Sequence, residues 1–432
     1  MGKKKWKASF LAVLFLALCC ACTAHEPIQE EVSSALPESQ PQQEEAQKVF
    51  ESSLSFVNPH SGPGAASSDG YYDYHTLPDG SVILMYTDYA TKTRVPLCSS
   101  PSCVHQDETC SAWYAYTGGG MLPLVVGQRL VLAVNGSNDS IAQENATEPY
   151  IEAMALDGTG KEKVISLPDG MMFESPFVTD DTSFYAICSQ TQIDEGGQTV
   201  LSQRQLIKFD LEQKNYTVLH TFENAGAYLE GCTADSLLVR TVDSTSGGEK
   251  DAVVQYSLSS QSVKEIVSWK PPCIGRVFSD QFYLFDPASC ELSALDCTSG
   301  TKIVLGTLGS LEAPFTAVQF KDKIDDRLIY EAITVGETTS VTQYFAFDLT
   351  NKTSVELTLK TQDTMHETPL IVLAEFGDNL LVSPAARVEM VNISASDGTT
   401  LPMPSLSYQY TLMTKADYWN NQPNYMSMDT AM

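Results

Sequence analysis

The chain has 432 residues, with 54 acidic against 26 basic side chains and a net charge of −28. This charge argues against nucleic acid as a partner, because a polyanion would be repelled by the field of the protein. The length fits two or three average domains, or one long all-β domain.

The first residues predict an export signal that ends at a lipidation site. The basic segment MGKKKWK precedes an uncharged apolar run of 14 residues, Ala8 to Ala21, which is too short to span a membrane comfortably. The run ends in Leu-Cys-Cys-Ala-Cys, and a small residue before a cysteine suits the peptidase that processes lipoproteins. We therefore predict that residues 1–21 are a lipoprotein signal peptide and that Cys22 carries the lipid, with Cys20 as the alternative. Acyl chains such as palmitate would anchor the protein to the outer face of the cell membrane, at the cell surface.

The segment after Cys22 is rich in Glu, Gln, Ser, Pro and Ala. Such a composition buries too little apolar surface to order itself, so residues 22–69 are predicted to be a flexible, lipid-anchored tether. The run SGPGAASS marks the expected boundary, and a folded domain is predicted over residues 70–432.

A weak internal repeat predicts the fold of this domain. Seven segments each consist of an alternating strand, a polar turn and a second alternating strand, as in a β-hairpin. Their turns lie at Asp88, Asp157, Asp210, Ser257, Asp296, Asp348 and Asp397, with spacings of 69, 53, 47, 39, 52 and 49 residues. A four-stranded propeller blade repeats every 40 to 50 residues or so.

The repeat therefore predicts an all-β protein, a β-propeller of seven blades, with six or eight blades as alternatives. Further strand-like runs between the hairpins would supply the inner strands of each blade. A propeller must close its ring so that no strand edge is left unpaired. The segment Ser407 to Met413 is expected to return to the first blade, whose first strand is expected at Tyr71 to Tyr74.

A cysteine-rich insertion at residues 98–113 follows the first hairpin. It places Cys98, Cys103, His105 and Cys110 within thirteen residues. Three thiolates and one imidazole would complete the closed tetrahedral shell of a structural zinc ion. The alternative is a disulfide, because exported proteins oxidise their cysteines. A disulfide would leave one thiol over, for a partner among Cys188, Cys232, Cys273, Cys290 and Cys297, and unligated thiols are a third alternative.

Two runs, VPLCSSPSCVHQDETCSAW and the closing YTLMTKADYWNNQPNY, resemble a family of uncharacterised propeller-type surface lipoproteins of clostridial and related Gram-positive gut anaerobes. The resemblance implies a cell-surface lipoprotein and no established activity. The chain departs from the family pattern in its cysteine-rich lipidation site and in Ser257, which replaces an acidic turn residue.

No catalytic motif is present, so the sequence predicts that the protein is not an enzyme. The expected function is a membrane-tethered binding or scaffold protein, whose propeller face takes a peptide, a glycan or a protein partner. One alternative is a carbohydrate-active hydrolase or lyase with its site at the propeller channel. Another is an envelope sensor or assembly factor. The only cofactor that the residues suggest is the structural zinc.

Overall fold

The computed structural model describes residues 54–57, 60, 62–115, 119–136, 148–193, 199–222, 226–243, 249–309, 315, 317–335, 340–362, 367–394 and 399–431. The predicted signal peptide, Cys22 and the tether up to residue 53 lie outside these residues. All the described residues belong to one compact unit. Within them, no helix is long and apolar enough to cross a membrane, and the one helix present, α1 (Lys415–Trp419), has five residues.

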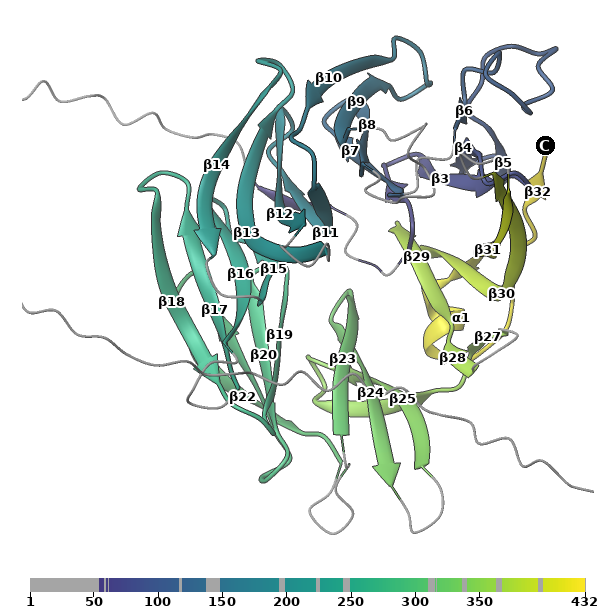
Figure 1. The fold of residues 1–432 in the computed structure, drawn as a ribbon. Helices are drawn as coiled ribbons and strands as arrows, with labels where there is room; N and C mark the ends of the chain where they lie inside the picture. The colour runs from purple at the N-terminus through teal and green to yellow at the C-terminus, as the bar shows by residue number, and fades with distance from the viewer. Residues whose placement is uncertain are drawn as a thin grey trace, which may run out of the picture. The chain divides into compact units, whose positions relative to one another are not determined.

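Seven sheets of predominantly antiparallel strands stand around a common centre, which confirms the prediction of a seven-bladed β-propeller (Figure 1). We number the blades 1 to 7 in chain order. Blade 1 consists of β2 (Ala65–Ala66), β3 (Gly70–Thr76), β4 (Val82–Asp88), β5 (Thr93–Pro96), β6 (Trp113–Tyr114) and β32 (Asp429–Thr430). Blade 2 consists of β7 (Met121–Val126), β8 (Arg129–Val134), β9 (Tyr150–Ala155) and β10 (Glu162–Ser166). Blade 3 consists of β1 (Ser55–Val57), β11 (Met171–Thr179), β12 (Ser183–Ile193), β13 (Thr199–Asp210) and β14 (Asn215–Phe222).

Blades 4, 5 and 6 are each four consecutive antiparallel strands. Blade 4 consists of β15 (Gly226–Cys232), β16 (Ser236–Asp243), β17 (Lys250–Ser257) and β18 (Ser262–Trp269). Blade 5 consists of β19 (Ile274–Phe278), β20 (Gln281–Asp286), β21 (Glu291–Asp296) and β22 (Lys302–Thr307). Blade 6 consists of β23 (Ala317–Ile324), β24 (Arg327–Val335), β25 (Ser340–Asp348) and β26 (Thr353–Leu357). Blade 7 consists of β27 (Lys360–Gln362), β28 (Glu367–Pro369), β29 (Ile371–Phe376), β30 (Asn379–Ser394) and β31 (Thr400–Thr414).

Six of the predicted turns, five acidic and one at Ser257, join outer strands of blades 1 to 6. In four of them the carboxylate of Asp88, Asp210, Asp296 or Asp348 accepts a hydrogen bond from the backbone N–H three residues further on, at 2.7 to 2.8 Å. The residue after this N–H, four positions beyond the aspartate, has a positive φ, as in four-residue hairpin loops built around a type I turn. These residues are Lys92, Lys214, Gly300 and Lys352. Ser257 makes the same contact more weakly, at 3.3 Å, and Asp397 lies outside the described residues.

The core lies between the blades. The first strands of neighbouring blades contact each other around the centre, β7 with β11, β11 with β15, β15 with β19 and β19 with β23. Alternate apolar residues of adjacent sheets pack face to face, as the period-2 patterns require. Leu124 and Val131 of blade 2, for example, share a buried cluster with Phe177 and Phe184 of blade 3.

The described residues before Gly70, which are 54–57, 60 and 62–69, pack with the propeller, and in this part the structure differs from the tether predicted over residues 22–69. β1 pairs antiparallel with β11, the inner strand of blade 3. His60 lies across the ring, where its Nδ1 contacts Asp322 on β23 at 2.7 Å and its Nε2 contacts Glu375 on β29 at 3.2 Å. β2 then pairs with β3 in blade 1. The described residues of the segment 54–66 thus contact inner strands of blades on opposite sides of the ring.

The glycines of the predicted boundary run are packing residues. A Cβ at Gly64 would lie 2.2 Å from the carbonyl oxygen of Tyr72, and one at Gly62 would lie 2.5 Å from the hydroxyl of Tyr71. The backbone N–H of Gly64 donates to that hydroxyl at 2.8 Å. Gly62 and Gly64 therefore let the chain approach β3 closely, and they do not mark the start of the domain.

The ring closes differently from the prediction. Ser407 to Met413 does not form a strand of blade 1, because it lies within β31 and pairs with β30 in a long hairpin. The chain end returns instead, since β32 pairs in parallel with β5. Side chains complete the closure, and Tyr71 and Tyr89 of blade 1 share a core cluster with Leu373, Leu381 and Leu412 of blade 7.

Candidate metal centre and the adjoining pocket

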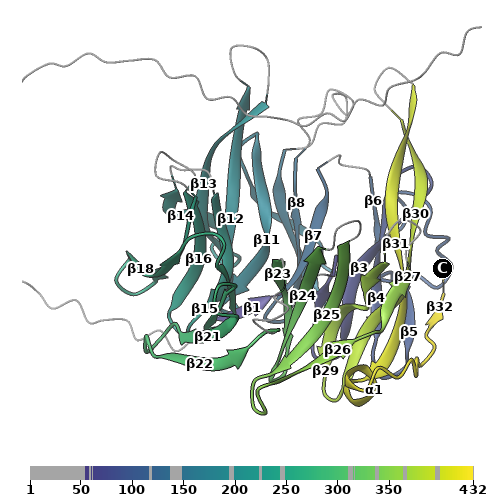
Figure 2. The same ribbon diagram turned by 90° about the horizontal axis from the view of Figure 1, so that it is seen from below.

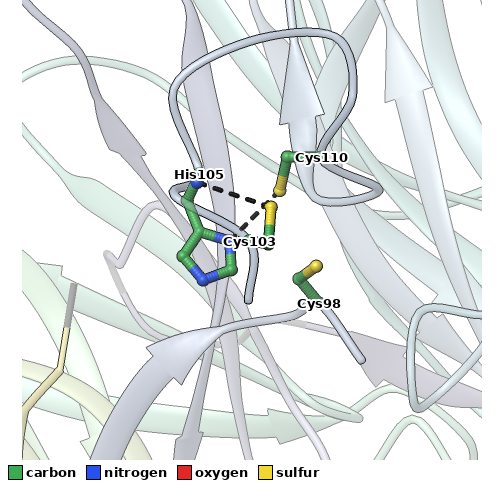
Figure 3. A group of neighbouring side chains, drawn as sticks. All are labelled: Cys98, Cys103, His105 and Cys110. Carbon is green, nitrogen blue, oxygen red and sulfur yellow. Dashed lines mark hydrogen bonds between the residues drawn. The ribbon is translucent and has the colours of Figure 1, made fainter. Parts of the chain in front are cut away.

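The four residues predicted as metal ligands gather in one cluster in the insertion of blade 1. Cys98 follows β5, Cys103 and His105 lie in the loop, and Cys110 immediately precedes β6. Figure 3 shows the side chains converging, with the three sulfur atoms and the imidazole on a common centre. Cys110 is buried, while the other three residues are partly exposed.

The four ligand atoms of this cluster lie near enough to one another to surround one cation. One ligand atom from each of the four residues lies within 4.8 Å of all the others. His105 Nδ1 is 3.2 Å from Cys110 Sγ, and the His105 backbone N–H donates to Cys103 Sγ at 3.4 Å. His105 has a φ of +53°, an uncommon value for a residue with a side chain, so the loop is bent at the point that brings the imidazole to the sulfurs.

The three thiols influence one another's ionisation. Burial raises the pKa of Cys98, but hydrogen bonds from Ser111, Ser100 and the other two thiols outweigh this effect and lower the pKa to about 7. Burial, together with the neighbouring thiols, raises the pKa of Cys110 to about 12. Without a cation, Cys98 therefore loses its proton far more readily than Cys110. A divalent cation would stabilise the thiolate forms of all three cysteines.

None of the cysteines in the described residues forms a disulfide. The five cysteines considered as partners for a left-over thiol lie in blades 3, 4 and 5, outside the core cluster that holds the three thiols of the insertion. The three thiols thus converge on each other and on one imidazole. Among the described residues, no second group of histidine, cysteine and acidic side chains gathers in this way.

A pocket of about 420 Å³ lies beside the insertion, between blades 1, 2 and 7. The strands that line it are β3 to β9 and the long β30–β31 hairpin. In Figure 2 this hairpin extends past the neighbouring strands on the side of the ring where β6 also lies. Sequence analysis missed the pocket because its residues are separated by up to about 350 positions, and only the assembled ring brings them together.

One wall of the pocket contains a buried ion pair. Arg94 on β5 is 6% exposed, and its Nη2 lies 2.7 Å from Oδ2 of Asp73 on β3, which has no exposed surface. The hydroxyl of Tyr410 on β31 donates to the same oxygen, and the guanidinium carbon lies 4.5 Å from the Tyr410 ring. Burial alone would lower the pKa of Arg94, but Asp73 and Tyr410 more than offset this and raise it. Burial also raises the pKa of Asp73, although Arg94 and Tyr410 work against this rise.

The insertion and the pocket are structurally connected. After Cys110 the chain passes through Ala112, whose carbonyl accepts a hydrogen bond from Leu84 at 2.8 Å, directly into β6. β6 pairs with β4 and places Tyr114 in the pocket wall, where its hydroxyl donates to Glu152. The cysteine cluster therefore fixes the loop that positions one side of the pocket.

No family model matches the chain, and no curated protein is similar to it in sequence. Solved structures share the propeller fold at low similarity. TolB from Acinetobacter baumannii is 14% identical over 78% of this chain and 80% of its own, with a TM-score of 0.32. An oligogalacturonate lyase in complex with manganese is 9% identical over 85% and 98%, with a TM-score of 0.44. A nidogen/laminin complex is 12% identical over 65% and 90%, with a TM-score of 0.32. These proteins differ in function, and the likeness concerns the fold alone.

Proposed function

We propose that the protein is a lipid-anchored extracytoplasmic binding protein that captures its ligand in the pocket between blades 1, 2 and 7. The pocket carries this proposal. It combines a volume of about 420 Å³ with apolar walls and a few polar groups, which is the usual composition of a small-molecule site. The hydrolase or lyase alternative placed its site in the central channel, where residues of the segment 54–66 contact the inner strands of opposite blades.

The anchoring part of the proposal rests on the N-terminal sequence, with its basic start, its apolar run and Ala21 before Cys22. It is tested by expressing the full chain in a Gram-positive host with radiolabelled palmitate. The wild-type chain is expected to incorporate the label and to be degraded by protease added to intact cells. Cys22→Ala should abolish labelling, while Cys20→Ala, the matched control, should not. Labelling of Cys22→Ala at the wild-type level would overturn the assignment.

The same proposal includes a structural Zn²⁺ held by Cys98, Cys103, His105 and Cys110. Zinc–sulfur and zinc–nitrogen bonds of about 2.3 and 2.0 Å place tetrahedral ligand atoms about 3.8 Å apart. The observed upper limit of 4.8 Å requires the loop to contract by about 1 Å. Four protein ligands leave no open position for substrate, so the ion would stabilise the insertion and would not catalyse a reaction.

The zinc assignment is tested by metal analysis and thiol titration on the full chain purified without oxygen. One zinc per chain is expected, together with its loss in Cys103→Ala and in His105→Ala. Cys188→Ala, which removes a buried thiol from blade 3, is the control and should retain the ion. A metal-free wild-type chain in which two of the three insertion thiols resist labelling until a reductant is added would establish the disulfide instead.

A further inference from the structure

Tyrosines and apolar side chains make up most of the pocket wall. The tyrosines are Tyr74, Tyr114, Tyr150, Tyr408 and Tyr410, and the apolar side chains include Val391, Ile393, Met403 and Leu406. A tyrosine ring offers an apolar face and a polar edge at small entropic cost. Such a wall suits a ligand that itself has apolar faces and a polar rim.

A buried donor in the pocket wall specifies one group of the ligand. The Nε of Arg94 is inaccessible and has no hydrogen-bond partner, although the guanidinium lines the pocket. That nitrogen is out of a ligand's reach, but the guanidinium carries several other N–H donors, and those on its pocket side can donate to an acceptor oxygen of the ligand. Asp73 already neutralises the charge of Arg94 at 2.7 Å. The acceptor is therefore best an uncharged oxygen, because a second carboxylate would add an uncompensated negative charge.

Two further polar side chains require a ligand that also donates. Glu389 on β30 lines the pocket and offers a carboxylate, which only accepts. His75 on β3 lines it as well, and burial together with nearby Arg94 lowers the pKa of its imidazole, which is therefore neutral at pH 7. A neutral imidazole both donates and accepts. The pocket thus presents a donor, an acceptor and a group that does both, all beside tyrosine rings.

From this arrangement we infer that the pocket binds a neutral carbohydrate, with a sugar ring against the tyrosines and its hydroxyl groups on Arg94, His75 and Glu389. The inference rests on the proposed function as a binding protein and specifies its ligand class. Sugar hydroxyls donate and accept around one ring, while the C–H faces of the ring are apolar. The net charge of −28 adds a reason to prefer a neutral ligand to an acidic sugar.

The test uses the full chain in detergent on an array of neutral oligosaccharides, acidic oligosaccharides and uncharged hexapeptides. Isothermal titration calorimetry then measures the affinity for the strongest ligand. We expect binding to a neutral oligosaccharide only. Glu389→Gln and Tyr408→Ala, both on the β30–β31 hairpin, should weaken it at least tenfold.

A matched pair of methionines on the same hairpin supplies the control. Met403 lines the pocket and is 42% exposed, whereas Met390 is 58% exposed and does not line it. Met403→Ala should weaken binding about three- to tenfold, and Met390→Ala should leave it unchanged. Both side chains are largely exposed, so neither change threatens folding.

The outcomes separate this inference from the proposed function. Preferred binding of a peptide or an acidic sugar, weakened by the hairpin variants, would overturn the carbohydrate and keep the binding role. Binding of a neutral sugar unaffected by all three pocket variants would overturn the pocket as its site. The absence of any binding, with Cys22 labelled by palmitate, would overturn the inference and the binding role while leaving the anchor intact.

Discussion

Blades 4 to 6 and the seam between blades 1 and 7 are both made mainly of antiparallel hairpins. They differ in how many polar atoms they bury without a hydrogen-bond partner. Blades 4 to 6 are consecutive four-stranded sheets. The seam takes strands from both ends of the described chain. Seven buried side-chain polar atoms in the described residues lack a hydrogen-bond partner. Six of them belong to blades 1 and 7, namely Oδ1 of Asp73, Oγ1 of Thr87, the hydroxyl of Tyr89, Nε of Arg94, Nε1 of Trp113 and Oγ1 of Thr368.

This difference shows where a repeat protein can accommodate buried polar groups and binding sites. In a regular blade every position is constrained by packing between two similar neighbours, so apolar alternation is the stable solution. At the seam the repeat is interrupted by the cysteine insertion, by the extended β30–β31 hairpin and by the returning chain end. The pocket and the buried ion pair lie there, while the cysteine cluster belongs to blade 1 and packs with residues of blade 2. The following changes test this contrast, in order of expected effect.

Replacing Arg94 by Ala should have the largest effect. It leaves the carboxylate of Asp73 buried without a cation, and breaking a buried pair in this way costs about 3–5 kcal/mol of unfolding free energy. Urea denaturation measures this loss. Lys250→Ala in blade 4 is the control, because its pair with Glu265 is 41% and 49% exposed, and it should cost less than about 1 kcal/mol. Equal losses for the two variants would show that the seam is no more sensitive than a regular blade.

Replacing His60 by Gln should remove a stabilising effect that depends on pH. Burial would lower the pKa of His60, but Asp322 and Glu375 raise it to about 9, and Lys415 and Asp325 complete the charged group. Because the folded-state pKa exceeds the unfolded value of about 6.5, the stabilisation is complete below pH 6.5 and is lost as the pH rises through 9. At pH 6 it is on the order of 3 kcal/mol.

Urea denaturation of wild type and His60→Gln at pH 6, 8 and 10 measures this effect. The difference in unfolding free energy should be largest at pH 6 and should shrink towards pH 10. His220→Gln on β14 is the matched change, since His220 packs on the rings of Phe222 and Tyr256. A difference between wild type and His60→Gln that stays constant with pH would contradict the charged contact.

Removing the proposed zinc ion should weaken ligand binding indirectly. The insertion continues into β6, which carries Tyr114 in the pocket wall. A less rigid insertion should lower the affinity for the pocket ligand about three- to tenfold, equivalent to roughly 1 kcal/mol. Calorimetry before and after treatment with a zinc chelator, and again after zinc is restored, measures this coupling. An unchanged affinity in the metal-free protein would show that the two sites are independent.

The smallest effect is expected in a regular blade. Ser257→Asp restores the acidic turn residue and should stabilise the protein by about 0.5 kcal/mol, because the carboxylate accepts more strongly from the N–H of Ser260 than the hydroxyl does at 3.3 Å. Ser259→Asp adds the same charge two residues away and serves as the control. If both variants change the melting temperature equally, the effect comes from charge and not from the turn.

The parts of the structure that sequence analysis predicted are those encoded locally. The hairpin at Asp348 was recognised because the alternation of apolar residues, the turn residue and the second strand lie within a few positions of each other. The Cys98–Cys110 cluster was recognised for the same reason, and the structure brings its four residues together.

The missed parts depend on contacts between distant residues. β1 has three residues in a polar segment, and it becomes a strand only because β11 supplies its partner. The pairing partner of Ser407 to Met413 was predicted wrongly. The alternation of apolar and polar residues in this segment suits a strand of blade 1 as well as a strand of blade 7. The β30–β31 hairpin fixed the choice by pairing residue by residue from Asn379↔Thr414 to Ser394↔Thr400. The pocket needs three blades in place, so no short stretch of sequence reveals it.

The position of β1 has a mechanical consequence. Among the described residues, a pull on the chain from its N-terminal side acts first on Ser55–Val57, and then on His60, before it acts on β2 in blade 1. Resistance to such a pull is governed by the rate at which this short strand detaches and not by the stability of the whole ring. Under tension, β1 and then the charged contact of His60 would therefore release in turn, and the chain would lengthen while the other strands of the seven blades stay paired.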